Sequence, residues 1–396
     1  MEYQRSIVEK LTKFLEKPLP IFQVLIGPRQ VGKTTAAQQL IKNLEFPSIY
    51  ATADQILPPG PEWIEGQWNL AQLKFAESKK PILLVLDEVQ KVYRWSEVIK
   101  RLWDEEKSKG NIRLLILGSS ALLLQKGLSE SLSGRFFLHK MPHWCFFECK
   151  QAFKWNLNQW IYFGGYPGAA IFTSEESDWK KYVSESLIET VLAKDVIGMF
   201  PIQKPALIRH LFGLAATYPA QILSYNKMLG QLQDAGNATT LAHYLKLLEG
   251  AFLVSGLELF SRGQIKKRGS SPKLILWNNA LINALSLKSF KKSLEDQNWW
   301  GRLVENAVGA FLLNYLPDSE WNVSYWRDGS IEVDFVLSHG EKIIAIEVKS
   351  GSTVRKNGLE LFKKKYPEAK IMLIGQGGLP LKEFFLARPQ EIFENL

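Results

Sequence analysis

Apolar positions in the first third of the chain fall into short continuous runs separated by stretches with helical spacing. The runs predict buried strands at 21–26, 81–86 and 112–117, and a shorter strand is expected at 46–50. Apolar residues spaced three and four apart predict helices at 1–20, 35–41, 70–79 and 98–105. The prolines between 54 and 61 favour a loop. Strands that alternate with helices indicate an α/β fold built on a parallel sheet.

The pattern changes after the turn-rich stretch at 161–168. Helical spacing continues over 176–218, and two further helical patterns, 226–234 and 239–249, flank a short turn that contains Gly236. Near the C-terminus, a helical pattern at 303–313 precedes two strand-like runs, 330–337 and 343–349, joined by a turn. We therefore expect a helical middle region followed by a C-terminal α/β region.

The stretch between the first strand and its helix has the composition of a phosphate-binding loop. It begins with Gly27 and ends with Thr34, and the glycines allow a tight turn in which backbone N–H groups approach a polyphosphate. Lys33 can reach the β- and γ-phosphates, and the Thr34 hydroxyl can bind Mg²⁺. The predicted cofactor-binding residues are Gly27, Pro28, Arg29, Gln30, Val31, Gly32, Lys33, Thr34 and Thr35.

Polar side chains follow the next two buried strands. Asp87 and Glu88 end the run at 81–86, where Asp87 would hold Mg²⁺ and Glu88 would activate the attacking water. Ser119 follows the strand at 112–117 and could sense the γ-phosphate, although a plain turn is the alternative. Arg135 could stabilise transition-state charge in its own or a neighbouring subunit, or form an ordinary surface ion pair.

Length, composition and charge narrow the classes of protein to which the chain can belong. The chain has 396 residues, too many for one ordinary domain, and 46% hydrophobic with 22% charged residues fits a soluble globular protein. No apolar run approaches the ~20 residues of a membrane helix. The N-terminus lacks the apolar core of a signal peptide, and two cysteines form neither a disulfide framework nor a zinc set, so we expect a reducing cytoplasm. The net charge of +9 permits a nucleic-acid partner or a merely solvated basic surface.

The order of these motifs resembles AAA+ and related P-loop ATPases. It is most similar to a prokaryotic family in which GPRQVGKTT, LVLDEVQ, LILGSS and LSGRF occur in this order. The resemblance implies ATP as the nucleotide, with Mg²⁺, and an ATPase core at 1–160. It also implies a helical and winged-helix-like region at 161–265 and a nuclease-like α/β domain at 266–396. DNA binding and self-association stay open.

The paired helical patterns in the middle region resemble the helix-turn-helix of a winged helix. The second pattern offers only His243 and Lys246 as basic groups, so a packing or oligomerisation module is an equal alternative. The basic stretch at 262–268 could be a wing that contacts phosphate, or a solvated loop.

Four residues near the C-terminus form a candidate metal site. The strand period places Glu347 and Lys349 on one face, and Asp334 on the preceding strand could lie opposite Glu347. With Glu305 in the upstream helix, the set resembles the PD-(D/E)xK nucleases, which implies Mg²⁺ bound by Glu305, Asp334 and Glu347 with Glu347 and Lys349 in catalysis. Ion pairs at strand ends are the alternative.

The function expected from these features is Mg²⁺-dependent ATP hydrolysis that controls a nuclease-like C-terminal region, whose binding of DNA stays open. The alternative is a non-enzymatic ATP switch whose C-terminal acids are vestigial.

Overall fold

The computed structural model describes residues 3–54, 59–119, 128, 131–232, 236–262, 271–316, 320–351 and 357–394. The fold is α/β, and its contacts divide the chain into two compact units, Met1–Pro142 and His143–Leu396. The three domains expected from the sequence, with boundaries at 160 and 265, stay a prediction.

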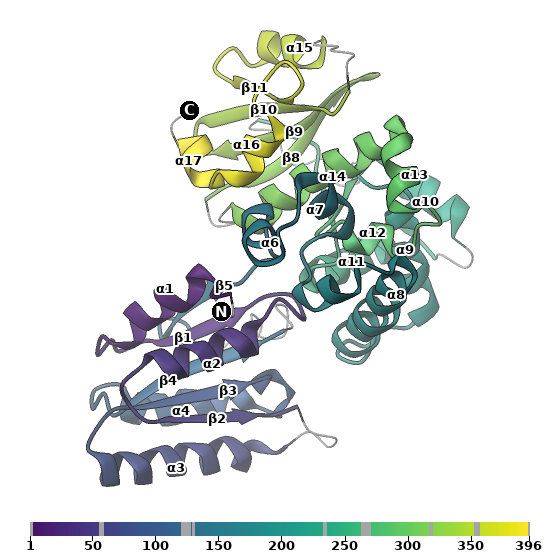
Figure 1. The fold of residues 1–396 in the computed structure, drawn as a ribbon. Helices are drawn as coiled ribbons and strands as arrows, with labels where there is room; N and C mark the ends of the chain where they lie inside the picture. The colour runs from purple at the N-terminus through teal and green to yellow at the C-terminus, as the bar shows by residue number, and fades with distance from the viewer. Residues whose placement is uncertain are drawn as a thin grey trace. The chain divides into compact units, whose positions relative to one another are not determined.

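The first unit contains a five-stranded sheet in the order β2-β3-β4-β1-β5 (Figure 1). Its strands are β1(Phe22–Ile26), β2(Ser48–Thr52), β3(Ile82–Asp87), β4(Ile112–Gly118) and β5(Phe136–Lys140). Every pair is parallel, and each residue of β1, β3 and β4 is buried. The parallel sheet predicted from the continuous apolar runs is confirmed.

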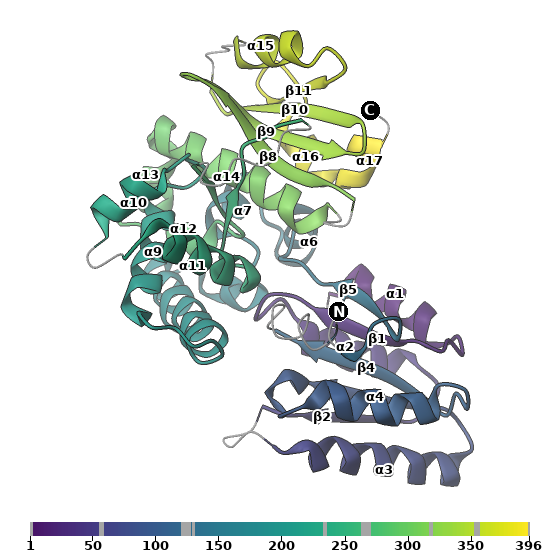
Figure 2. The ribbon, with the colours of Figure 1, turned by 180° about the vertical axis from the view of Figure 1, so that it is seen from behind.

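Helices cover both faces of this sheet. The elements are α1(Ser6–Leu15), α2(Lys33–Asn43), α3(Pro61–Ser78), the short 3₁₀-helix η1(Val89–Lys91) and α4(Trp95–Glu106). Helices α1 and α2 pack together on one face, and α3 and α4 pack together on the other, which Figure 2 shows from behind. Helix α3 begins at Pro61 rather than at 70, because proline is well tolerated in the first turn, where its missing N–H is not needed.

The parallel arrangement brings the candidate site to one edge of the sheet. The carboxyl end of β1 leads into the phosphate loop, and its neighbour β4 ends at Gly118. Next to β4, β3 ends at Asp87, which pairs in register with Leu117. Ligands of open α/β sheets bind at this edge.

The second unit begins with helices. They are α6(Phe146–Phe153), α7(Leu157–Phe163), η2(Pro167–Phe172), α8(Glu176–Lys181), η3(Tyr182–Ile188), η4(Val191–Ile197), α9(Pro205–Thr217), α10(Tyr225–Gln231) and α11(Ala238–Gly250). The helical prediction for 176–218 is confirmed, with π-helical geometry in η3 and η4. Helices α10 and α11 match the two predicted helical patterns. All but Arg262 of the basic stretch at 262–268 lies outside the described residues.

Two short strands follow, β6(Val254–Leu257) and β7(Lys273–Leu276), and they pair antiparallel. Then come α12(Ala280–Asn283), α13(Phe290–Glu295) and α14(Gln297–Tyr315). Helix α14 is longer than the predicted 303–313, because Asp296 caps its N-terminus by accepting from Trp299 N.

The C-terminal sheet has the order β11-β10-β9-β8. Strands β8(Asn322–Asp328), β9(Ile331–His339) and β10(Lys342–Lys349) form an antiparallel meander, and β11(Lys370–Gly375) pairs parallel to β10. The predicted hairpin is confirmed. Helix α15(Asn357–Lys365) packs a core cluster with β9 and β10, and α16(Leu381–Leu386) and α17(Pro389–Glu394) end the fold.

No helix in the parts of the chain listed above combines the length and the apolar character that a membrane crossing needs.

Candidate functional site

The phosphate loop depends on two glycines for different reasons. A Cβ at Gly27 would lie 2.1 Å from the carbonyl oxygen of Met141, so no side chain fits there. Gly32 has a φ of 95°, in the left-handed region that glycine adopts most easily, and α2 starts directly after it. Gln30 also has a positive φ, of 59°. A positive φ at a residue other than glycine is uncommon, and such residues cluster at ligand-binding loops.

Lys33 lies folded over this loop. It is the first residue of α2 and is 7% exposed. Its Nζ donates to the carbonyl oxygens of Gly27 at 2.9 Å and Pro28 at 2.7 Å. The ammonium is therefore held at the loop itself, where a phosphate group would meet it. Of the other predicted loop residues, Val31 is fully buried and Thr35 lies in the first turn of α2.

Thr34 and Asp87 supply oxygen ligands of the kind that Mg²⁺ prefers. Thr34 Oγ1 lies 3.2 Å from Asp87 Oδ2, and the Tyr50 hydroxyl donates to the same carboxylate oxygen at 2.6 Å. Burial raises the pKa of Asp87, while the bond from Tyr50 opposes the shift. Burial and the neighbouring Asp87 raise the pKa of Tyr50, which keeps its hydroxyl protonated as a donor. The donor set fits a Mg²⁺–nucleotide.

Glu88 is held by a separate set of partners. Ser119 Oγ donates to Glu88 Oε2 at 3.1 Å, and Gln90 Nε2 donates to the same oxygen. Glu88 has a φ of 55°, so the chain turns sharply after β3. The structure thus brings together Lys33, Thr34, Asp87, Glu88 and Ser119. It adds Tyr50 and Gln90, which the sequence analysis did not predict.

Arg135 lies at the other end of the strands, where β1 and β5 begin, and not at their carboxyl ends where the phosphate loop lies. It immediately precedes β5, whose first residue Phe136 pairs with Phe22 at the start of β1. Its guanidinium forms a two-point ion pair with Asp104, at 3.0 and 2.9 Å, and holds the pKa of that carboxyl well below its usual range. The structure does not bring Arg135 to the phosphate loop of its own subunit, because β5 runs parallel to β1 and Arg135 stands at its beginning.

The four predicted C-terminal residues do converge, around an unpredicted lysine. Glu305 comes from α14, Asp334 from β9, and Glu347 and Lys349 from β10. Lys273, the first residue of β7, lies among them with Nζ 2.6 Å from Glu305 Oε1 and 3.6 Å from Asp334 Oδ1. Lys349 Nζ lies 2.5 Å from Glu347 Oε1. We call these five residues the acid–lysine cluster.

Burial dominates the electrostatics of the acid–lysine cluster. Burial raises the pKa of Glu305 and that of Glu347, and repulsion from Asp334 adds to both shifts. Burial acts to lower the pKa of Lys273, but the carboxylates of Glu305 and Asp334 outweigh it, and the pKa lies above its usual value. Among the described residues, no three histidine, cysteine, aspartate or glutamate side chains are grouped so that they could hold a metal ion.

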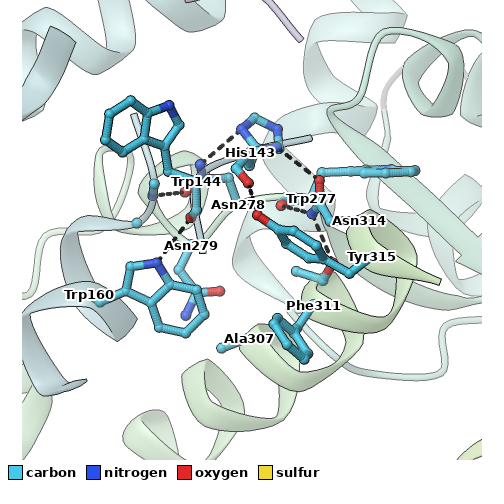
Figure 3. A pocket seen from close by; sticks show the side chains of 13 residues that line it. His143, Trp144, Trp160, Trp277, Asn278, Asn279, Ala307, Phe311, Asn314 and Tyr315 are labelled. Carbon is cyan, nitrogen blue, oxygen red and sulfur yellow. Dashed lines mark hydrogen bonds between the residues drawn. The ribbon is translucent and has the colours of Figure 1, made fainter. Parts of the chain in front are cut away.

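A small cavity lies elsewhere in the second unit, between α7, α14 and the segment that follows β7 (Figure 3). Its volume is ≈ 30 Å³, enough for about one or two water molecules. Asn278 and Asn314 line it and donate to His143 Nδ1 and to the carbonyl oxygen of Trp277. At this size it can hold water but no metabolite.

Comparison with known families supports the assignment of the nucleotide site. A family model described as "AAA domain" matches residues 21–150, the stretch that carries the phosphate loop, Asp87, Glu88 and Ser119. Residues 21–150 are therefore a nucleotide-binding region of the P-loop ATPase type. Two models described as domains of unknown function match residues 154–292 and 300–384.

Individual relatives are distant. An uncharacterized protein of Methanocaldococcus jannaschii is 22% identical over 402 residues, covering 90% of this chain and 81% of its own. A Walker-type ATPase of Pyrococcus abyssi has 14% identity and a TM-score of 0.49, over 72% of this chain and 96% of its own. The Orc1 protein of Aeropyrum pernix, solved in complex with DNA, has 14% identity and a TM-score of 0.31, over 72% and 93%.

Proposed function

We propose that this protein hydrolyses ATP with Mg²⁺ at the edge of the sheet where β1, β3 and β4 end. The observation that carries the proposal is the separation of two adjacent carboxylates into different environments. Asp87 is bonded to Thr34 and Tyr50, whereas Glu88 is bonded to Ser119 and Gln90. Two neighbouring acids with different partners support two different roles, one in metal binding and one in proton transfer.

Each side chain has a task that its position supports. Lys33 binds the β- and γ-phosphates, and Thr34 with Asp87 holds Mg²⁺. When bound, Mg²⁺ neutralises charge that develops on the phosphoryl oxygens. Glu88 orients the attacking water and accepts its proton. Ser119 positions the Glu88 carboxylate through the bond at 3.1 Å.

The direct test is ATP affinity and turnover of the full chain with Lys33→Ala. Loss of the ammonium at the loop should abolish productive ATP binding, measured by calorimetry. Lys42→Ala is the matched control, because Lys42 is an exposed lysine on the same helix. Unchanged ATP affinity in Lys33→Ala would refute the proposal.

The C-terminal region has two candidate roles. Convergence of Glu305, Asp334, Glu347 and Lys349 supports a nuclease-like arrangement, with nucleic acid as the substrate class. The pairing of each carboxylate with a basic side chain favours the alternative, a non-catalytic region in an ATP-dependent switch. Cleavage of plasmid and single-stranded DNA by wild type, lost in Asp334→Ala, would decide for the nuclease.

Control of the second unit by nucleotide stays a prediction. Hydrogen–deuterium exchange of β7–β10 with and without a non-hydrolysable ATP analogue tests it, and Lys33→Ala serves as the control that should show no change. An action of Arg135 in a neighbouring copy also stays a prediction. It requires the Asp104 ion pair to open, and Arg135→Ala should then lower a turnover that rises with protein concentration.

A further inference from the structure

Lys273 is a buried lysine whose contacts the nucleotide site does not explain. It is 1% exposed, although lysine is rarely buried unless it is paired. Besides its contacts with Glu305 and Asp334, Nζ donates to the carbonyl oxygen of Asp334 at 3.0 Å and lies 4.9 Å from the centre of the Phe335 ring. Carboxylates, a carbonyl and an aromatic face are all partners of a cation.

The charges of the surrounding groups balance without a metal ion. The three carboxylates of Glu305, Asp334 and Glu347 face Lys273, Lys349 and Arg302, whose Nη1 lies 3.7 Å from Glu305 Oε2. These six groups sum to zero when all are ionised, and the exposed Glu332 adds only a weaker attraction for Lys273. Protonation of any carboxyl group makes the set more positive. A divalent cation would therefore add charge to a neutral or positive environment, which burial makes costly.

The geometry of Asp334 also leaves little for a metal. Asp334 Oδ2 accepts from Val348 N at 2.8 Å, and Oδ1 faces Lys273. Asp334 also lies in a β-bulge between β8 and β9. Trp326 of β8 pairs with Val333 and Ser324 pairs with Val336, so Asp334 and Phe335 together oppose one residue of β8. The β9–β10 pairing ends at Phe335 and Ile346, and beyond it the Asp334 carboxylate, rather than a backbone carbonyl, receives the Val348 N–H.

We propose that the ammonium group of Lys273 takes the place of a divalent cation in the acid–lysine cluster, so that this region folds around an internal lysine and binds neither Mg²⁺ nor Mn²⁺ there. The proposal is independent of ATP hydrolysis in the first unit. It assigns Lys273 a structural role that joins β7, α14 and β9, and it predicts no metal-dependent DNA cleavage by this region.

The first experiment titrates Mn²⁺ into the nucleotide-free full chain by calorimetry, with wild type beside Asp334→Asn. The two proteins should give the same number of Mn²⁺ sites and the same affinities. A Mn²⁺ site in wild type that Asp334→Asn loses would overturn the proposal. This outcome is independent of ATP turnover, so it separates the proposal from the proposed function.

The second experiment removes the ammonium. Lys273→Met should lower the midpoint of thermal unfolding by about 10 °C, because it leaves Glu305 and Asp334 without their partner. Addition of Mn²⁺ should recover part of the loss in Lys273→Met and should not raise the midpoint of wild type. Lys342→Met, an exposed lysine on β10, is the matched control and should unfold like wild type. An unchanged midpoint in Lys273→Met would contradict the proposal.

Discussion

Thr34 and Asp87 meet at the sheet edge, with Thr34 Oγ1 3.2 Å from Asp87 Oδ2, although 53 positions separate them in sequence. The contact joins the first turn of α2 to the last residue of β3. It is the geometric link between the phosphate loop and the acidic strand end. Each of the two was predicted separately from the sequence, and their meeting supports a single Mg²⁺–nucleotide site.

Tyr50 is expected to tune metal binding at this site. Its hydroxyl donates to Asp87 Oδ2 at 2.6 Å and so orients the carboxylate. Tyr50→Phe should weaken the affinity for Mg²⁺ in ATP binding by about tenfold, so that more Mg²⁺ is needed for the same ATP affinity. This is the usual scale for loss of a group that orients a metal ligand. The measurement is ATP affinity as a function of Mg²⁺ concentration. Affinity measured without Mg²⁺ should stay unchanged, and an unchanged Mg²⁺ dependence would show that Tyr50 has no such role.

The phosphate loop was predictable because its chemistry is local. Strand, loop and helix follow one another, and the predicted 21–26 and 35–41 became β1 and α2 with small changes at their ends. The contact of Tyr50 was not predictable in this way. It depends on β2 lying beside β3 with Thr52 opposite Asp87, a register that no short pattern in the sequence encodes.

His139 should make the first unit sensitive to acid. Burial, with a smaller effect of Lys10, lowers the pKa of His139 from 6.5 to about 4, and its Nε2 lies 2.8 Å from Gln23 Oε1. The folded state therefore keeps His139 neutral while the unfolded chain takes up a proton. The stability of the fold with a neutral His139 is fully present above pH 6.5 and is lost as pH falls towards 4, because protons then favour the unfolded chain. The loss amounts to about 3 kcal/mol.

The check is urea unfolding across that pH range. His139→Gln should flatten the fall of the urea midpoint with decreasing pH, since glutamine cannot be protonated. His210→Gln, an exposed histidine on α9, is the control and should keep the wild-type slope. A wild-type slope in His139→Gln would show that other groups cause the acid sensitivity.

Gly164 should tolerate no side chain. Its φ is 71°, and a Cβ there would lie 1.9 Å from Asn278 Oδ1 and 2.7 Å from Ala280 N. Gly164→Ala should destabilise the protein by about 3 kcal/mol, because both strain and a clash with a buried polar group arise. Gly213→Ala in α9, where a Cβ meets nothing within 4 Å, should instead stabilise it by about 0.5–1 kcal/mol. Equal unfolding midpoints for the two variants would contradict this explanation.

The tight packing at Gly164 shows where sequence patterns fall short. The stretch at 161–168 has the composition of a linker, yet Asn278 Oδ1 accepts from Gly165 N at 3.2 Å and Asn279 Nδ2 donates to Ile161 O at 2.8 Å. Buried asparagines give no periodic signal. Lys273 escaped prediction for a similar reason, since one lysine at the start of an apolar run looks like an exposed strand end.

Turnover and binding of ATP by Glu88→Gln test the central claim most directly. Glutamine keeps the shape of the side chain but is a far weaker base, so ATP affinity should stay within about twofold of wild type while turnover falls at least about a hundredfold. Glu105→Gln, an exposed acid on α4, should behave like wild type. Wild-type turnover in Glu88→Gln would contradict the account, because the water would then be activated by another group.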